Sequence, residues 1–403
     1  MSSAHPCDPA ARLDGIALSE IVRISEAARK LRAQGHDVIS LGTGEPDFPT
    51  PPHVIEAAHA AAKAGETRYT PTAGTPRLRA AIAAAAAREC GFSPDTGEVI
   101  VSTGAKQVIF NALMATLDPG DEVIIAAPCW SSYPDMVRTC GGVPVLVPTS
   151  AAEGFRLRAE PVRAALGQRS RWLLLNSPGN PSGAVLGEAE LQALAALVRE
   201  TPQLGVISDE IYQHIAYAPF VSFRAAAPDL AARTLVVNGV SKAYAMTGWR
   251  IGWGIGPAGL IRAMTTVQGQ VTSGAPSVSQ AAALAALEGP QDLLAERCEG
   301  FRARRDLVVD ALNATGRLHC PRPDGAFYVF ANCSGCFGLT SAGGHVIADD
   351  GDFCDALLAE SGVALVPGRA FGAPGHFRLS YAYDSESLRL ACARIADFCA
   401  GLH

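Results

Sequence analysis

Lysine is the charged residue type that this 403-residue sequence uses least. It occurs only at positions 30, 63, 106 and 242, and arginine supplies the rest of the 33 Lys and Arg side chains. A reaction that needs an amine nucleophile therefore has few candidates in this chain. The sequence also has no basic stripe, and its formal net charge is -6, so nucleic acid is not an expected partner.

Long apolar runs are absent as well. No stretch approaches the roughly 18 apolar residues that span a bilayer, and residues 1–15 lack the pattern of a signal peptide. We therefore expect a cytoplasmic protein with no membrane partner. Hydrophobic residues make up 48% of the chain and charged residues 18%, which is typical of a compact globular protein, and the length favours two or three domains.

The eleven cysteines do not form a disulfide framework, because their number is odd and their spacing irregular. Cys333 and Cys336 form a CxxC pair, but a structural zinc site needs four ligands and no second pair is present. We therefore predict free thiols in a Gly- and Ser-rich loop, and no metal site.

Apolar and helical segments alternate through the first 290 residues. Helical spacing marks residues 16–35, 53–64 and 76–90. Near-continuous apolar runs, typical of buried strands, are EVIVS, EVIIAA, WLLLN, LGVISD and TLVVNG. This alternation indicates a mostly parallel sheet with helices on both faces. In such a sheet the ligand binds beyond the carboxyl ends of the strands, and polar residues follow each of these runs.

The pattern changes near residue 290. A long charged helix at residues 291–315 precedes shorter strand segments at 325–331, 363–368 and 376–382 and a final helix. We therefore expect a smaller α/β domain with mixed strands after the larger one.

Two segments suggest a site for an anion and an amine. Lys242 follows an apolar strand, where partial burial lowers the pKa of an amine so that it can attack a carbonyl, and Arg250 can bind a phosphate nearby. The glycine turn at residues 102–107 places free N–H groups at a helix start, although many such turns bind nothing. GWGIG at 252–256 is not a dinucleotide loop and indicates a strand with a close backbone approach.

Other strand-end residues have both a catalytic and an ordinary interpretation. Asp209 is costly to bury unless paired, for example with a protonated ring nitrogen; otherwise it is a helix cap. Tyr212 can donate to a ring hydroxyl, Trp130 can stack on a ring, and Asn180 can contact a phenolic oxygen. Arg378 can bind a carboxylate with two parallel bonds; its alternative is a surface ion pair.

Together these segments resemble the class I aminotransferases of the pyridoxal-phosphate (PLP) fold type I, and most closely the bacterial aspartate aminotransferase subgroup. The likeness runs from about residue 12 to the end of the chain. Its motifs, in order, are GEPDF at 44–48, YTPTAG at 69–74, GAKQ at 104–107, PCWSSYP at 128–134, NSPGNPSG at 176–183, SDEIY at 208–212, SKAYAMTGWRIG at 241–252 and RLSYA at 378–382.

The resemblance implies an α/β fold with a mostly parallel seven-stranded sheet flanked by helices. It divides the chain into an N-terminal arm and part of the small domain (residues 1–48), a large PLP-binding domain (49–290) and a C-terminal small domain (291–403). It also implies a homodimer with shared active sites, in which Tyr69 reaches the phosphate bound by the partner subunit.

The resemblance assigns a role to each candidate residue. Lys242 carries PLP and moves a proton, Asp209 pairs with the ring nitrogen, and Tyr212 and Asn180 contact the ring 3-oxygen. The groups expected to bind the phosphate are the N–H groups of Gly104, Ala105 and Lys106 and the side chains of Ser241 and Arg250. The residues expected around the substrate are Gly44, Trp130, Asn180 and, for the α-carboxylate, Arg378.

The implied reaction is amino transfer from an L-amino acid, aspartate before others, to 2-oxoglutarate by a ping-pong mechanism. The subgroup has a threonine near the N-terminus where this chain has Ile21, so an aromatic amino acid, prephenate or another substrate stays an alternative. Two further alternatives are a PLP lyase that cleaves at Cβ or closes a ring, and a non-enzymatic regulator, although no helix-turn-helix segment or basic patch precedes residue 16.

Overall fold

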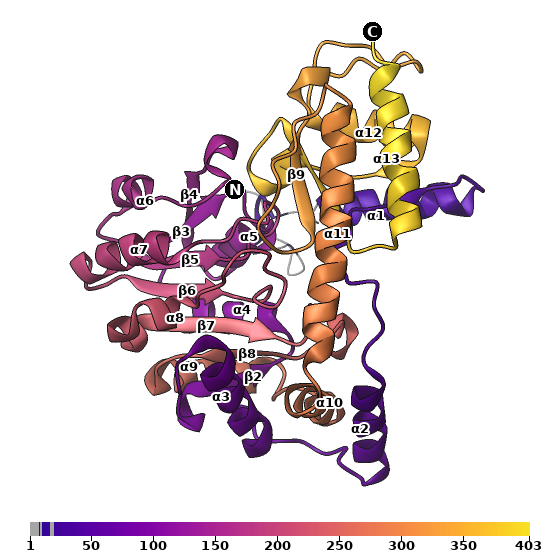
Figure 1. Cartoon of the computed structure of the whole chain (residues 1–403). Coiled ribbons are helices and arrows are strands. Elements are labelled where there is room, and N and C mark those ends of the chain that lie inside the picture. Colours follow the sequence, from indigo (N-terminus) through magenta and orange to yellow (C-terminus); the bar gives the residue numbers. More distant parts are fainter. Residues whose placement is uncertain (1–7, 9, 17–19) are drawn as a thin grey trace.

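The computed structural model describes residues 8, 10–16 and 20–403, and a seven-stranded sheet forms its largest layer (Figure 1). The strands are β2 Val99–Ser102, β3 Glu122–Ala127, β4 Val143–Pro148, β5 Ser170–Asn176, β6 Gly205–Asp209, β7 Thr234–Gly239 and β8 Gly252–Ile255. Their order in the sheet is β2-β8-β7-β6-β5-β3-β4. β8 alone runs antiparallel, to both β2 and β7. The predicted mostly parallel seven-stranded sheet is confirmed.

Helices lie on both faces of this sheet because each has an apolar side. They are α3 Pro76–Cys90, α4 Ala105–Thr116, α5 Ser132–Thr139, α6 Ala159–Ala165, α7 Glu188–Glu200, α8 Phe223–Ala226, α9 Ala258–Val271 and α10 Ser277–Glu288. A further helix, α2 Pro52–Lys63, packs against α10 (Figure 1). Val108 of α4 packs in one buried cluster with Ile207 of β6. Leu194 of α7 packs in another cluster with Val206. Neighbouring β6 residues thus face opposite layers, as strand geometry requires.

The predicted helix limits agree closely with the structure. α3 spans the predicted residues 76–90; the Thr75 hydroxyl accepts from the Leu78 N–H at its start, and Gly91 ends it with φ +74°. α2 begins one residue early because Pro52 takes the first helical position. The helix predicted at 16–35 is α1 Glu20–Ala33; residues 17–19 lie outside the described part of the chain.

A smaller group of elements lies beside the large sheet (Figure 1). It contains α11 Asp292–Ala314, β9 Tyr328–Asn332, α12 Asp350–Ser361, β10 Val363–Ala364, β11 Val366–Pro367, β12 His376–Ser380 and α13 Ser385–Ala400. β11, β12 and β9 form an antiparallel sheet, and β10 pairs in parallel with β1 Ile39–Ser40. The single strand predicted at 363–368 is therefore two, because the chain changes partner at the buried Leu365.

The α11 helix connects the two groups of elements (Figure 1). The domain limits at residues 48 and 290 stay predictions. None of the described helices is long and apolar enough to cross a membrane. Cys333 and Cys336 are fully buried, and the described residues contain no group of three or more His, Cys, Asp or Glu side chains that could hold a metal ion.

Candidate active site

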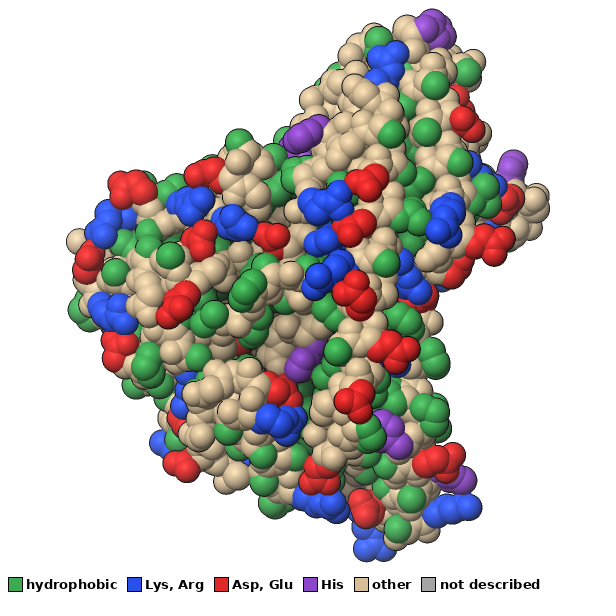
Figure 2. Space-filling view, in the orientation of Figure 1, with side chains coloured by type: hydrophobic (Ala, Val, Ile, Leu, Met, Phe, Trp, Pro, Cys, Tyr) green, Lys and Arg blue, Asp and Glu red, His purple; other side chains and the backbone are tan. Residues whose placement is uncertain are grey.

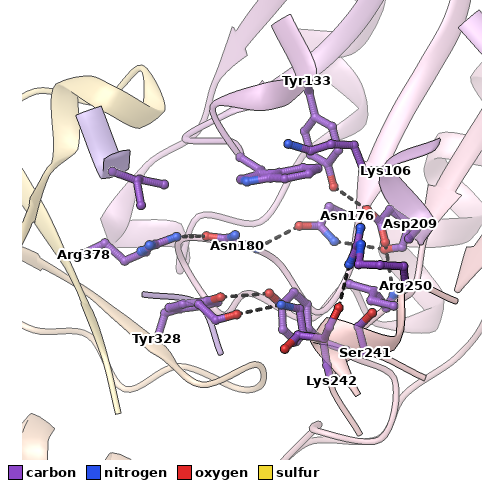
Figure 3. Close-up of a pocket in the computed structure, with 17 residues that line it drawn as sticks. Lys106, Tyr133, Asn176, Asn180, Asp209, Ser241, Lys242, Arg250, Tyr328 and Arg378 are labelled. Atoms are coloured by element: carbon purple, nitrogen blue, oxygen red, sulfur yellow. Dashed lines mark hydrogen bonds between the residues drawn. The ribbon is translucent and has the colours of Figure 1, made fainter. Parts of the chain in front are cut away.

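A cavity of about 280 Å³ lies at the carboxyl ends of the parallel strands, against the smaller group of elements (Figure 3). The predicted residues that line it are Gly44, Ala105, Lys106, Trp130, Asn180, Asp209, Tyr212, Ser241, Lys242, Arg250 and Arg378. Ile21 lines it as well. The sequence interpretation did not single out five further lining residues, which are Tyr133, Asn176, Ile211, Thr247 and Tyr328.

An anion cradle forms where β2 turns into α4. Gly104 precedes the helix with φ +90°, and a Cβ there would lie 2.5 Å from Nη2 of Arg250, so only glycine fits. Its own N–H donates to the Ser102 carbonyl at 2.8 Å. The N–H groups of Ala105 and Lys106 belong to the first helical turn and have no acceptor within the helix, which favours a bound anion there.

Arg250 completes this cradle from the other side. The backbone of Arg250 has φ +57°, a left-handed conformation that is rare outside glycine. Nη1 donates to the Thr247 carbonyl at 2.8 Å and Nη2 to the Thr103 carbonyl at 3.3 Å. The guanidinium is thus fixed against the α4 start, beside the pocket into which Ser241 also faces. This arrangement suits a phosphate.

Lys242 follows β7 and enters the same pocket. Its Nζ donates to the Gly44 carbonyl at 2.7 Å. Although the side chain stays partly accessible, surrounding protein lowers the pKa of the amine to about 8, mainly by burial; the Glu45 charge opposes this shift, and the Arg378 and Arg250 charges add to it. A larger fraction of this amine is neutral near pH 8 than of an ordinary lysine, as a nucleophile requires.

Asp209 ends β6 and is only 4% exposed. One carboxylate oxygen accepts from the Tyr133 hydroxyl at 2.7 Å and the other from the Ile211 N–H at 3.2 Å. The second bond is a local contact to a residue two positions on, but no helix begins there, so the predicted alternative of a helix cap is wrong. Burial nevertheless raises the pKa of Asp209 to about 6. A cationic partner inside the pocket, such as a protonated ring nitrogen, would offset that cost.

Arg378 lies on β12 and is only 1% exposed. Nη1 donates to Oδ1 of Asn180 at 2.9 Å and Nη2 to the Gly42 carbonyl at 2.6 Å, while Nε has no hydrogen-bond partner in the described part of the chain. The predicted alternative, a surface ion pair, is wrong. A buried guanidinium without an anion is suited to a carboxylate ligand.

Asn180 lies in the loop that follows β5, and hydrogen bonds hold it there. Its N–H donates to Oδ1 of Asn176 at 2.8 Å, and Nδ2 of Asn176 donates to the Asp209 carbonyl at 3.0 Å. Tyr212 is buried, and its hydroxyl lies 2.9 Å from the hydroxyl of Tyr328. These bonds connect the ends of β5 and β6 to the strand β9 (Figure 3).

Lys106 lies on another side of the pocket from Arg378 (Figure 3). Its Nζ donates to the Ser132 hydroxyl at 3.2 Å and lies 4.6 Å from the centre of the Trp130 ring. The Trp130 ring meets Tyr133 edge-on, with ring centres 5.2 Å apart. Trp130 is therefore a wall of the pocket, and its partly buried side chain also packs against a buried hydrophobic cluster.

Tyr69 does not line this pocket. It is 94% exposed and belongs to a separate open groove between residues 67–70 and 272–278. Because Tyr69 does not line the pocket of its own chain, its predicted role requires a second subunit.

Some of the residues missed in the sequence carried a usable signal. Tyr133 lies three positions after Trp130, and Asn176 is the last residue of an apolar strand. Tyr328 lies two residues before Phe330, which pairs with Arg378 in the structure, so it shares the Arg378 side of the sheet; the sequence alone does not give this pairing. Thr247 and Ile211 had no such signal.

A strand-end lysine, a buried aspartate and an anion cradle around one pocket define a PLP enzyme that acts on amino groups, and the residues present fit that cofactor. The chain belongs to the family Aminotransferase class I and II, which matches residues 36–395. It is a PLP-dependent aminotransferase of the bacterial aspartate aminotransferase type.

Individual relatives are similar over nearly the whole chain. An aspartate aminotransferase of Rhizobium meliloti (strain 1021) is 51% identical over 97% of this chain and 96% of its own length. An aspartate/prephenate aminotransferase of Cereibacter sphaeroides is 52% identical over 95% of this chain and 96% of its own length. The crystal structure of the Rhizobium meliloti aspartate aminotransferase superimposes with a TM-score of 0.96 at 50% identity and covers 98% of this chain and 100% of its own. The structure of a Thermus thermophilus aspartate aminotransferase with maleate superimposes with a TM-score of 0.90 at 44% identity and covers 97% of this chain and 99% of its own.

Proposed function

We propose that this enzyme transfers the amino group of L-aspartate to 2-oxoglutarate by a ping-pong mechanism. One observation carries the proposal: two cationic side chains, Arg378 and Lys106, line the pocket that holds Lys242. Aspartate and 2-oxoglutarate each have two carboxylates, so one cation can bind each group. The names of the Rhizobium meliloti relatives and the dicarboxylate maleate in the Thermus thermophilus structure support this choice.

The pocket residues have separate tasks in this mechanism. Arg378, fixed by Asn180, binds the α-carboxylate and orients the Cα–H bond. The α4 start and Arg250 bind the phosphate, Asp209 keeps the ring nitrogen protonated, and Trp130 covers the ring. When bound, PLP accepts the electron pair that remains after the Cα proton leaves.

Lys242 first holds the cofactor and then acts as the base. Because the pKa of its amine is lowered to about 8, Nζ can take a proton from the substrate Cα and deliver it again within the pocket. The Gly44 carbonyl, 2.7 Å away, orients the amine while it is free. The same two cations serve the amino donor and the acceptor in turn, and this favours ping-pong kinetics over simultaneous binding.

The proposal includes a homodimer. The exposed Tyr69, in its open groove, acts on the phosphate of the other subunit, as the resemblance implies. Each subunit then has a complete site only in the dimer.

A second candidate is an aminotransferase that also accepts prephenate or aromatic substrates. One observation favours it: Ile21 lines the pocket, where it offers an apolar contact for a ring. The Cereibacter sphaeroides relative carries both aspartate and prephenate in its name. The comparisons favour amino transfer over the lyase and regulator alternatives.

The role of Lys106 tests the choice of substrate. We expect Lys106→Ala to lower kcat/KM for aspartate by about 100-fold, because a charge-assisted bond to the second carboxylate is lost. The value for alanine, which lacks that carboxylate, should change little. Lys63→Ala, which alters an exposed lysine of α2, is the matched control. An equal loss for aspartate and alanine would contradict the proposed dicarboxylate recognition.

A further inference from the structure

Tyr328 is buried among the groups that the proposed mechanism uses, yet it has no task in that mechanism. It lies on β9, is 1% exposed and lines the pocket. Its hydroxyl meets Tyr212, and its ring meets Arg378 (Figure 3). One side chain of the smaller sheet therefore contacts both the residue expected at the ring oxygen and the residue expected at the substrate carboxylate.

The hydroxyl contact joins two buried phenols. The hydroxyls of Tyr328 and Tyr212 lie 2.9 Å apart, and either of them can be the donor. When a ligand oxygen accepts the hydrogen of Tyr212, Tyr328 can donate to the Tyr212 oxygen, because a buried hydroxyl that donates nothing is costly. A donor behind a donor then strengthens the bond in front of it.

The ring contact fixes the arginine. The guanidinium carbon of Arg378 lies 4.6 Å from the centre of the Tyr328 ring and 4.8 Å from that of Phe371. The rings and the bonds to Asn180 and Gly42 therefore limit the orientations that the buried guanidinium can adopt.

Gly44 packs closely against the Tyr328 hydroxyl. A Cβ on Gly44 would lie 2.2 Å from the Tyr328 oxygen, and the Gly44 carbonyl accepts the bond from Lys242. The Tyr328 hydroxyl thus lies beside the segment whose carbonyl orients the amine, and a movement toward Gly44 would press on that segment.

We propose that Tyr328 is a positioning residue of the transamination site, which orients Tyr212 through its hydroxyl and Arg378 through its ring. The proposal rests on the roles given above to Tyr212 and Arg378. The effect of the hydroxyl and that of the ring can be tested separately, because phenylalanine lacks only the hydroxyl whereas leucine lacks the ring as well.

The hydroxyl effect is measured on the resting holoenzyme. The visible band of bound PLP is titrated with pH, and in Tyr328→Phe we expect its midpoint to rise by about half a pH unit. The reason is that weaker donation from Tyr212 stabilises the negative ring oxygen less. Tyr381→Phe is the matched control, because the Tyr381 hydroxyl is also buried and donates to the Ala326 carbonyl at 3.1 Å, outside the pocket. The control should lose thermal stability and keep the wild-type midpoint.

The ring effect is measured with maleate, an unreactive dicarboxylate. Tyr328→Leu should bind maleate about tenfold more weakly than wild type, because the stacking on Arg378 is lost, whereas Tyr328→Phe should stay within about threefold. An unchanged midpoint in Tyr328→Phe, or the same shift in Tyr381→Phe, would overturn the positioning role of the hydroxyl. Equal affinities of the leucine and phenylalanine variants would overturn that of the ring.

Neither readout needs turnover. If wild type fails to react with aspartate but Tyr328→Phe still shifts the midpoint of the pH titration, then aspartate is not the amino donor and the role of Tyr328 stands. If wild type reacts with aspartate and neither variant differs from it, only the role of Tyr328 is wrong. A protein that shows no PLP band at all would overturn both.

Discussion

Two of the buried charged side chains in the pocket have no ion-pair partner in the described part of the chain. Asp209 and Arg378 are bonded only to neutral groups, a phenol, an amide and backbone atoms. Isolated charges of this kind are costly to bury, so they are seldom retained for stability alone. They are explained if the ligands supply the missing charges, a ring cation at Asp209 and a carboxylate at Arg378.

The pKa of Asp209 leads to a stability prediction. Burial raises it from 3.8 to about 6, so between these pH values the folded protein binds more protons than the unfolded chain. The free energy of unfolding therefore falls as pH rises through this window, and the full penalty, up to about 3 kcal/mol, applies above pH 6. An asparagine at this position cannot ionise, so the Asp209→Asn variant does not carry this penalty.

We therefore expect Asp209→Asn to raise the melting temperature of the cofactor-free protein at pH 8, and to raise it less at pH 5. Thermal unfolding followed by circular dichroism at both pH values measures the difference. In the PLP-bound protein the variant should instead lose most of its activity. A gain in melting temperature that is equal at pH 5 and pH 8 would show that ionisation of Asp209 is not its cause.

At the scale of elements, the site depends on the close contact of β8 with the start of α4. A Cβ on Gly252 would lie 2.2 Å from the backbone nitrogen of Ala105, whose N–H is one of the expected phosphate ligands. The first residue of β8 and the first turn of α4 therefore cannot both keep their places if a methyl group is added.

We expect Gly252→Ala to weaken PLP binding by at least about tenfold, because the N–H groups of the cradle are displaced. Equilibrium dialysis of PLP measures this. Gly97→Ala is the control, since a Cβ there meets nothing within 4 Å. Wild-type PLP affinity in Gly252→Ala would mean that the cradle does not hold the phosphate.

The elements also show what the sequence can predict. Asp209 and Lys242 were placed correctly at strand ends because continuous apolar runs mark buried parallel strands, and their ends share one edge of the sheet. The antiparallel direction of β8 was not predictable, because both directions bury the same side chains. The division of residues 363–368 into β10 and β11 depends on pairing with β1 and β12, which are distant in sequence.

At the scale of the whole molecule, the outer surface resembles that of an ordinary globular protein. On the face that Figure 2 shows, acidic and basic side chains are interspersed. The exposed Tyr69, at 94%, and Val271, at 59%, lie at or beside the groove of residues 67–70 and 272–278. Large exposed apolar and aromatic groups of this kind are suited to an interface, in agreement with the proposed homodimer.

Mixed dimers test whether Tyr69 acts across that interface. Neither Lys242→Ala nor Tyr69→Phe homodimers should have appreciable activity. If Tyr69 serves the other subunit, each mixed dimer contains one site with both natural residues. An equal mixture, unfolded and refolded together, should then recover about one quarter of wild-type activity. No recovery above the average of the two homodimers would mean that Tyr69 does not act in the partner's site.

The most direct test of the central claim is the half-reaction of the purified PLP-bound enzyme with L-aspartate, without any oxo acid, followed in the visible spectrum. In wild type we expect the PLP band to convert to the pyridoxamine-type band and 2-oxoglutarate to restore the PLP band, whereas Lys242→Ala should show neither change. A PLP band that aspartate leaves unchanged, while aromatic amino acids convert it, would contradict the assignment of Lys106 and Arg378 to a dicarboxylate.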